Sequence, residues 1–123
     1  MEGGARLYEK AMPDLAPSIY RQRLVVEGTR RSPIGSSDVE RYLEDLTEVC
    51  GMRLLIPPVT HRSERFGWAG WVHWEESGAH FYAWDDPIFF SVDVYTCSSF
   101  DAERVVSFTA RALDADRVVG KAV

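Results

Sequence analysis

The sequence has little cysteine, little histidine and no excess of positive charge. Its 123 residues include two cysteines, Cys50 and Cys97, and three histidines. Two cysteines are too few for a disulfide framework and are not spaced like metal ligands, so we expect free thiols in a cytoplasmic protein. Lys and Arg number 14 against 19 Asp and Glu, which gives a formal net charge of −5. This balance argues against a general nucleic-acid binder and against binding to an anionic membrane.

Long apolar runs and targeting signals are also missing. No run approaches the roughly 20 apolar residues that a membrane-spanning helix needs. The first ten residues, MEGGARLYEK, lack the charged-then-apolar pattern of a signal peptide. The composition is that of a globular chain, with 46% hydrophobic, 12% aromatic and 27% charged residues. We expect a loosely held N-terminal arm over residues 1–19 and a single domain over residues 20–123.

Periodicity predicts two helices and six strands. The first helix is expected at 37–51, where Ser37 and Glu40 fit a capping box and Gly51 supplies the stop. The second is expected within 98–113, capped by Ser99 or Asp101. Strands are expected at 21–28, 52–56, 68–75, 79–84, 88–96 and 116–123, with a turn at 76–78 and a polar loop at 59–67. This order predicts an α+β two-layer sandwich, an antiparallel sheet with both helices on one face.

A spaced set of residues surrounds the predicted turn. Trp84 follows Ser77 by seven positions, and a segment DVYTC places a cysteine twenty positions after the same serine. By this spacing, the stretch 69–97 resembles the bacterial and archaeal S-adenosylmethionine decarboxylases, which depend on a pyruvoyl group. The residues that carry the resemblance are Gly70, Glu76, Ser77, Trp84, Asp93 and Cys97.

The resemblance implies a self-processing enzyme. In the family the chain is cut at a Glu-Ser bond, here Glu76-Ser77, and the serine becomes a pyruvoyl group, which would be the cofactor. That group withdraws electrons from the substrate as carbon dioxide leaves. A nearby acid must then return a proton, and Cys97 is the expected donor, because a thiol with a reference pKa near 8.5 is mostly protonated at neutral pH.

Three positions depart from the family pattern. Gly78 replaces a histidine, Ala69 replaces a serine that assists processing, and Tyr82 replaces the histidine that serves as the processing base. Tyrosine has a reference pKa near 10, against about 6.5 for histidine, so it is a poorer source of a base at neutral pH. His80 lies two residues from Tyr82, on the same strand face and about 7 Å away, and offers a displaced base.

Substrate contacts, metals and partners can also be predicted. Trp84, Trp74 and Asp93 are expected to contact the substrate, S-adenosylmethionine or a related amino acid such as arginine or ornithine in polyamine-type metabolism. His73, Glu75 and His80 could be read as a metal trio, but three ligands from one hairpin are a weak signal, so we expect no metal. The family's small bacterial members pair their sheets and share residues across the interface, which implies a homodimer.

Two functions stay open at this point. The first is a pyruvoyl-dependent decarboxylase, supported by the retained serine and cysteine. The second is an uncleaved relative that binds S-adenosylmethionine, regulates a partner subunit or has repurposed chemistry, supported by the lost histidine and serine. A plain dimerising structural domain has no positive support, although fold alone does not decide function.

Overall fold

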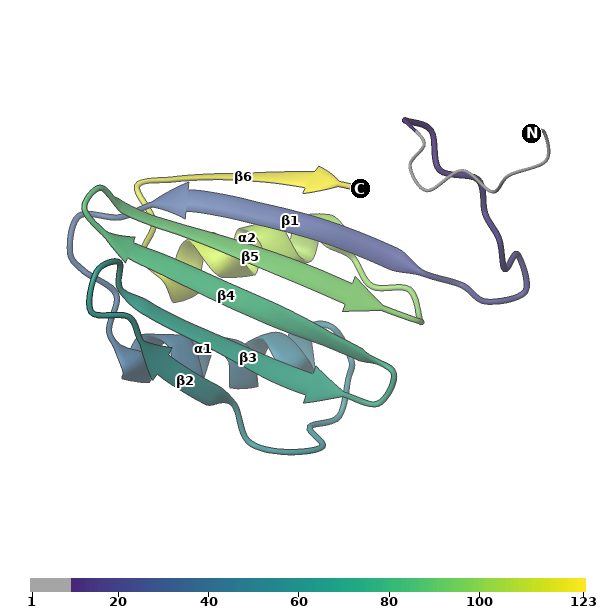
Figure 1. Cartoon of the computed structure of the whole chain (residues 1–123), viewed down its shortest axis with the longest axis horizontal. Coiled ribbons are helices and arrows are strands. Elements are labelled where there is room, and N and C mark those ends of the chain that lie inside the picture. Colours follow the sequence, from purple (N-terminus) through teal and green to yellow (C-terminus); the bar gives the residue numbers. More distant parts are fainter. Residues whose placement is uncertain (1–9) are drawn as a thin grey trace, which may run out of the picture.

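The computed structural model describes residues 10–123, which form a six-stranded sheet and two helices (Figure 1). All neighbouring strands are antiparallel, in the order β2-β3-β4-β5-β1-β6. The elements in chain order are β1 (Gln22–Thr29), α1 (Ser36–Val49), β2 (Val59–Arg62), β3 (Trp68–Trp74), β4 (Ser77–Asp85), β5 (Ile88–Thr96), α2 (Ala102–Ala112) and β6 (Arg117–Ala122). The predicted α+β architecture is confirmed.

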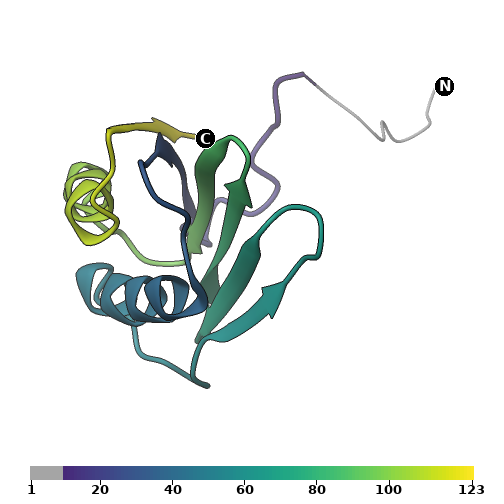
Figure 2. The same cartoon turned by 90° about the vertical axis from the view of Figure 1, so that its left-hand side faces the viewer.

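Both helices pack on one face of the sheet, and no element of the described chain covers the opposite face (Figure 2). The strands alternate accordingly: on β4, Ala79 and Phe81 are buried, whereas His80 and Tyr82 are exposed. The core lies between the sheet and the helices. Its largest fully buried side chains are Trp74, Tyr42, Phe81, Phe90, Ile34, Leu43, Leu46, Leu113, Val26, Val39, Val92 and Val105.

Buried threonines fix the helices to their neighbours. The Thr47 hydroxyl donates to the Leu43 carbonyl one turn earlier and accepts a 2.8 Å hydrogen bond from the Trp74 indole Nε1. Thr109 of α2 shares a 2.7 Å hydrogen bond with the Tyr42 hydroxyl of α1. Burial raises the pKa of that tyrosine, so it stays protonated. These bonds satisfy polar groups that would otherwise be left unpaired in the core.

The start of α1 differs from the prediction. The helix begins at Ser36 with Gly35 as its N-cap, so Ser37 lies inside the first turn. The Asp38 carboxylate accepts from the Gly35 N–H over 2.9 Å and pairs with Arg30 over 3.1 Å. The expected box of Ser37 and Glu40 is therefore wrong, because the observed box of Gly35 and Asp38 lies two residues earlier. Asp38, and not Glu40, is the third residue of the helix, from which a side chain can bond the backbone of the cap. Negative charge in this first turn is also favoured by the helix dipole.

The second strand also differs. The strand expected at 52–56 is absent, apart from an isolated bridge between Leu54 and Trp74. The strand β2 instead forms at 59–62, inside the expected polar loop, where it pairs with the first half of β3. It is one of the two edge strands of the sheet and is largely exposed, so its sequence lacks the alternating apolar pattern by which strands are recognised.

The remaining boundaries follow the prediction closely. Strand β5 spans 88–96 as expected, and Asp101 is the N-cap of α2, where its carboxylate accepts from the Arg104 N–H over 3.2 Å. The predicted arm falls partly on residues 1–9, which lie outside the described residues, and residues 10–21 form no helix or strand. Neither helix of the described segment has the length and apolar character needed to cross a membrane.

Candidate active site

The hairpin between β3 and β4 brings Glu76 and Ser77 against Cys97, which directly follows β5. The Cys97 backbone N–H donates a hydrogen bond to the Ser77 Oγ over 3.0 Å. The Cys97 thiol donates to the Glu76 carbonyl oxygen over 3.1 Å. Ser77 is the first residue of β4 and only 7% exposed, rather than part of the turn expected at 76–78. One residue therefore contacts both sides of the Glu76-Ser77 peptide bond.

The backbone of this turn is strained. Glu76 has a φ of 59°, in the left-handed region that non-glycine residues enter at a cost of about 1–2 kcal/mol. The two-residue connection from Trp74 to Ser77 leaves Glu75 and Glu76 to make the turn, without a glycine at the left-handed position. Strain of this kind often gathers at functional sites. Here it falls on the residue whose carbonyl faces the thiol.

The open face of the sheet next to this turn is organised in cross-strand rows. The row nearest the turn contains Arg23 on β1, Tyr95 on β5, Gly78 on β4 and His73 on β3. Within it, the Arg23 guanidinium stacks over the Tyr95 ring, 4.8 Å from the centroid. Gly78 supplies no side chain, so the row has a gap between a tyrosine and a histidine.

That gap is part of a hollow of about 590 Å³ on the open face. Its walls mix aromatic, basic and acidic groups, and its lining reaches the backbone of the Glu76-Ser77 link. It includes Arg23, Trp71, His73, Glu76, Ser77, Gly78, His80, Asp93 and Tyr95. The hollow is large enough for a small organic substrate, since ligand sites commonly enclose about 300–1,000 Å³.

The predicted bases lie in the next rows along the sheet. His80 is directly opposite Asp93 on β5 and Trp71 on β3. Its ring stacks on that of Tyr82, with centroids 6.2 Å apart, as residues two positions apart on one strand should. Tyr82 is 41% exposed and pairs with Ala69, so two of the three departures from the family pattern face each other across β3 and β4. Tyr82 lies five positions after Ser77 along β4, a distance of about 16 Å.

The two predicted tryptophans lie away from the hollow. Trp74 is fully buried on the helix-covered face and its indole is bonded to Thr47. Trp84 lies at the far end of β4, where its ring packs against Phe89 with centroids 5.5 Å apart. Of the three expected substrate contacts, only Asp93 lines the hollow beside Ser77.

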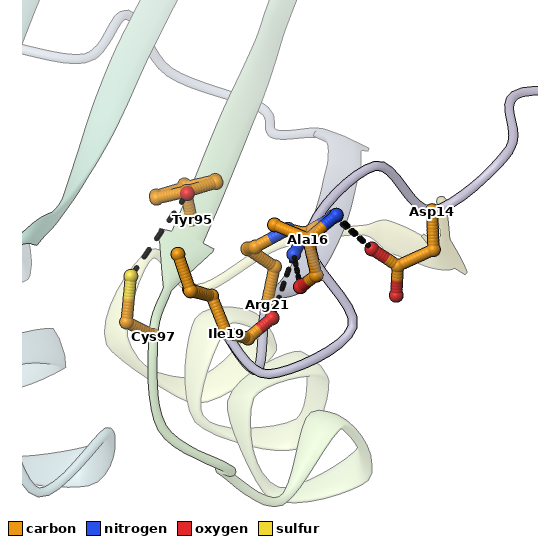
Figure 3. Close-up of polar contacts among 6 residues, drawn as sticks. All are labelled: Asp14, Ala16, Ile19, Arg21, Tyr95 and Cys97. Atoms are coloured by element: carbon orange, nitrogen blue, oxygen red, sulfur yellow. Dashed lines mark hydrogen bonds and ion pairs between the residues drawn. The ribbon is translucent and has the colours of Figure 1, made fainter.

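The N-terminal segment reaches the sheet beside Cys97. Gln22 pairs with Thr96, so Arg21 and the residues before it arrive next to the end of β5, as Figure 3 shows. Arg21 fixes this segment through a 2.8 Å ion pair with Asp14 and hydrogen bonds to two backbone carbonyls. The Tyr95 hydroxyl lies 3.9 Å from the Cys97 sulfur (Figure 3).

The two free thiols differ in environment. Cys50 is buried at the end of α1, and burial raises its pKa to about 12. Cys97 is partly exposed and adjoins the turn. Only Cys97 is therefore placed to take part in chemistry. Within residues 10–123, no group of three or more His, Cys, Asp or Glu side chains is arranged to hold a metal ion.

Sequence reasoning gave no role to Arg23 or Tyr95 and weighed His73 only as part of a metal trio. One signal was available: on β5, Tyr95 is two residues from Asp93 and so shares its face. The contribution of β1 could not be found in this way, because it depends on which strand pairs with β5. The register that sets His73 opposite Gly78 likewise comes from a two-residue turn at Glu75 and Glu76, where a three-residue turn at 76–78 was expected.

Comparisons with known proteins agree on one family. The S-adenosylmethionine decarboxylase family matches residues 34–123. Among solved structures, the chain is similar to the crystal structure of the adenosylmethionine decarboxylase from Aquifex aeolicus VF5, with a TM-score of 0.69, 16% sequence identity, and 85% of this chain and 89% of that chain covered. No curated protein sequence matches the chain. The chain belongs to the S-adenosylmethionine decarboxylase family and is an S-adenosylmethionine decarboxylase-like protein.

Proposed function

We propose that the protein is a pyruvoyl-type decarboxylase that cuts its own chain between Glu76 and Ser77. The observation that carries the proposal is the pair of hydrogen bonds from Cys97. One reaches the oxygen of the nucleophile and the other reaches the carbonyl that the nucleophile would attack. A serine in an ordinary surface turn requires neither bond.

The first step is attack by the Ser77 Oγ on the Glu76 carbonyl carbon. The carbon–nitrogen bond breaks, the nitrogen takes up a proton and an ester forms. As the carbonyl oxygen gains negative charge, the Cys97 thiol is already hydrogen-bonded to it and stabilises that charge. The Cys97 N–H holds the Ser77 Oγ in place, and the strained φ of Glu76 favours departure from the starting geometry.

The second step is elimination. A base removes the Ser77 α-proton, the Cβ–Oγ bond breaks, and Glu76 leaves as the carboxylate of the first fragment. Hydrolysis of the dehydroalanine gives a ketone and releases ammonia. The position fits such a group: residue 77 borders the hollow, and Gly78 next to it leaves the approach open. When formed, the pyruvoyl group supplies the electron sink for loss of carbon dioxide.

Residues around the hollow suit an amino-acid substrate with a cationic group. Trp71 and Tyr95 offer ring faces that attract a sulfonium or ammonium cation by about 0.5–2 kcal/mol, and Asp93 adds negative charge. The structural relative is described as an adenosylmethionine decarboxylase, and S-adenosylmethionine is the substrate we propose here, in polyamine-type metabolism. Cys97 is the proposed proton donor after decarboxylation, in a cytoplasmic enzyme whose thiols are both free.

We also propose a homodimer formed through the open sheet face. This face carries Val25, Trp71, Tyr82 and Phe89, an apolar set for a surface that faces solvent. Two copies packed face to face about a twofold axis would cover this surface on both.

The test is release of carbon dioxide from carboxyl-labelled S-adenosylmethionine. We expect release by the wild-type protein and none by Ser77→Ala, which cannot form the ketone. Cys50→Ala is the matched control, since its thiol is buried in the core and does not line the hollow, and it should keep activity. Binding of S-adenosylmethionine without any release of label would instead support the uncleaved, ligand-binding alternative.

A further inference from the structure

His73 is the histidine placed nearest to the Glu76-Ser77 link along the sheet. It stands directly opposite Gly78, the residue after Ser77, and cross-strand partners in a sheet have Cβ positions about 4.5–5.5 Å apart. His73 is exposed on the open face and lines the hollow together with Glu76 and Ser77. The hydrogen bonds from Cys97 serve the first step of processing, and the elimination step still needs a base that removes the Ser77 α-proton.

Gly78 keeps the space beside this imidazole open. A Cβ at position 78 would lie 2.7 Å from the Val72 carbonyl oxygen and 3.7 Å from the His73 Cα. A side chain at 78 is therefore disfavoured, and His73 faces a position that carries none. The tyrosine on the other side of the gap, Tyr95, is turned toward Arg23 and the Cys97 sulfur.

The other two histidines are less well placed. His80 is three strand residues from Ser77, about 10 Å along β4, and its ring stacks on Tyr82. His61 is on the edge strand β2, opposite Ala69, and borders a separate depression with Val59. His61, His73 and His80 are the three histidines of the chain.

We infer that His73 is the general base of the elimination step, an inference that rests on the proposed self-cleavage. Its neutral imidazole nitrogen takes the Ser77 α-proton, and the electron pair of that C–H bond forms the Cα=Cβ double bond. The Cβ–Oγ bond breaks at the same time, and its electrons leave on the Glu76 carboxylate. His73, on the facing strand of the hairpin, thus takes the role of base that Tyr82, which has no imidazole, does not fill.

The experiment follows self-cleavage of freshly made protein in five chains: wild type, His73→Ala, His73→Gln, His80→Ala and His61→Ala. Mass spectrometry under denaturing conditions measures the fraction cut at each time. We expect His73→Ala to slow formation of the ketone-led fragment at least about 100-fold, the usual contribution of a general base. His61→Ala, on the edge strand outside the hollow, is the control and should change it little. His80→Ala tests the competing base and should slow cleavage far less than His73→Ala. Added imidazole should restore cleavage of His73→Ala, a rescue that a packing defect would not show. His73→Gln, which keeps the size of the side chain, should be as slow as His73→Ala.

The outcomes separate the two claims. If the wild-type chain is never cut, both the proposed function and this inference fail. If the wild type is cut and His73→Ala is cut equally fast, self-cleavage stands and the inference is wrong. Loss of cleavage in His80→Ala alone would move the role of base to His80. Circular dichroism of each variant confirms that the fold is retained.

Discussion

The Cys97 thiol and the Glu76 carbonyl form the contact on which the proposed cleavage most depends. Cys97→Ala removes the thiol donor from the oxygen that gains charge, whereas Cys97→Ser keeps an O–H in its place. Loss of one preorganised donor to a developing oxyanion commonly slows a reaction about 100-fold or more, and a neutral thiol is a weak donor. We expect cleavage of Cys97→Ala to be slowed about 10- to 100-fold, and Cys97→Ser to stay closer to wild type, by time-resolved mass spectrometry.

The two thiols should also differ in reactivity. Burial raises the pKa of Cys50 to about 12, so at pH 8 this thiol is protonated in the folded state and does not react as a thiolate. Iodoacetamide at pH 8 should therefore modify Cys97 in the native protein and both cysteines after denaturation. Peptide mapping gives the labelled sites. Equal labelling of Cys50 in the native state would contradict its placement in the core.

At the residue scale, spacing in the sequence identified the reacting groups but not their geometry. Ser77 and Cys97 could be paired because their separation of twenty positions matches the family. The hydrogen bonds between them depend on how β4 and β5 are aligned, and that alignment is a property of the folded sheet. The role that we propose for His73 depends on register in the same way, because a shift of one residue would move its side chain to the other face.

At the scale of elements, α1 is joined to the sheet through Thr47. Its hydroxyl accepts the only hydrogen bond of the Trp74 indole found in the described chain. Thr47→Val is nearly the same size but leaves this buried N–H unpaired, which costs about 1–3 kcal/mol. We expect a fall of that size in the free energy of unfolding, measured by urea denaturation. The exposed Thr29→Val, on β1, should change stability by less than about 0.5 kcal/mol.

The elements differ in how far sequence could predict them. Strand β5 was predicted to the residue because it alternates regularly and follows the turn at 85–87. Strand β2 was missed because an edge strand with exposed side chains has no such pattern, whereas the apolar stretch 54–56 looked like a strand and is largely exposed. The α1 cap was displaced because Asp38 and Glu40 both suit a capping box, and the position of the helix start decides between them.

At the scale of the whole molecule, the bare sheet face predicts an association of two copies. Trp71 is partly exposed on this face, on β3, between the edge strand β2 and the strand that carries Ser77. Trp71→Glu places a charge where the sheets would meet, so it should convert a dimer of two 14.0 kDa chains into a monomer. Sedimentation velocity measures this. Phe66→Glu, an exposed aromatic in the loop before β3, is the matched control and should leave the dimer intact.

The two-layer arrangement was predictable from the order of elements, because strands in hairpin succession with two amphipathic helices fit few other folds. Which strands flank each other was not, since β1 joins the sheet between β5 and β6, far from its neighbours in sequence. That placement brings Arg23 to the hollow and the N-terminal segment to Cys97. Both features of the site therefore emerged only with the complete sheet.

The most direct test of self-cleavage is the mass of freshly purified protein under denaturing conditions. We expect two fragments, residues 1–76 and 77–123, the second beginning with a ketone instead of an amine. Ser77→Ala, measured beside it, should remain whole. A single intact wild-type chain of 14.0 kDa, unchanged after prolonged incubation, would contradict the proposed cleavage and with it the pyruvoyl chemistry.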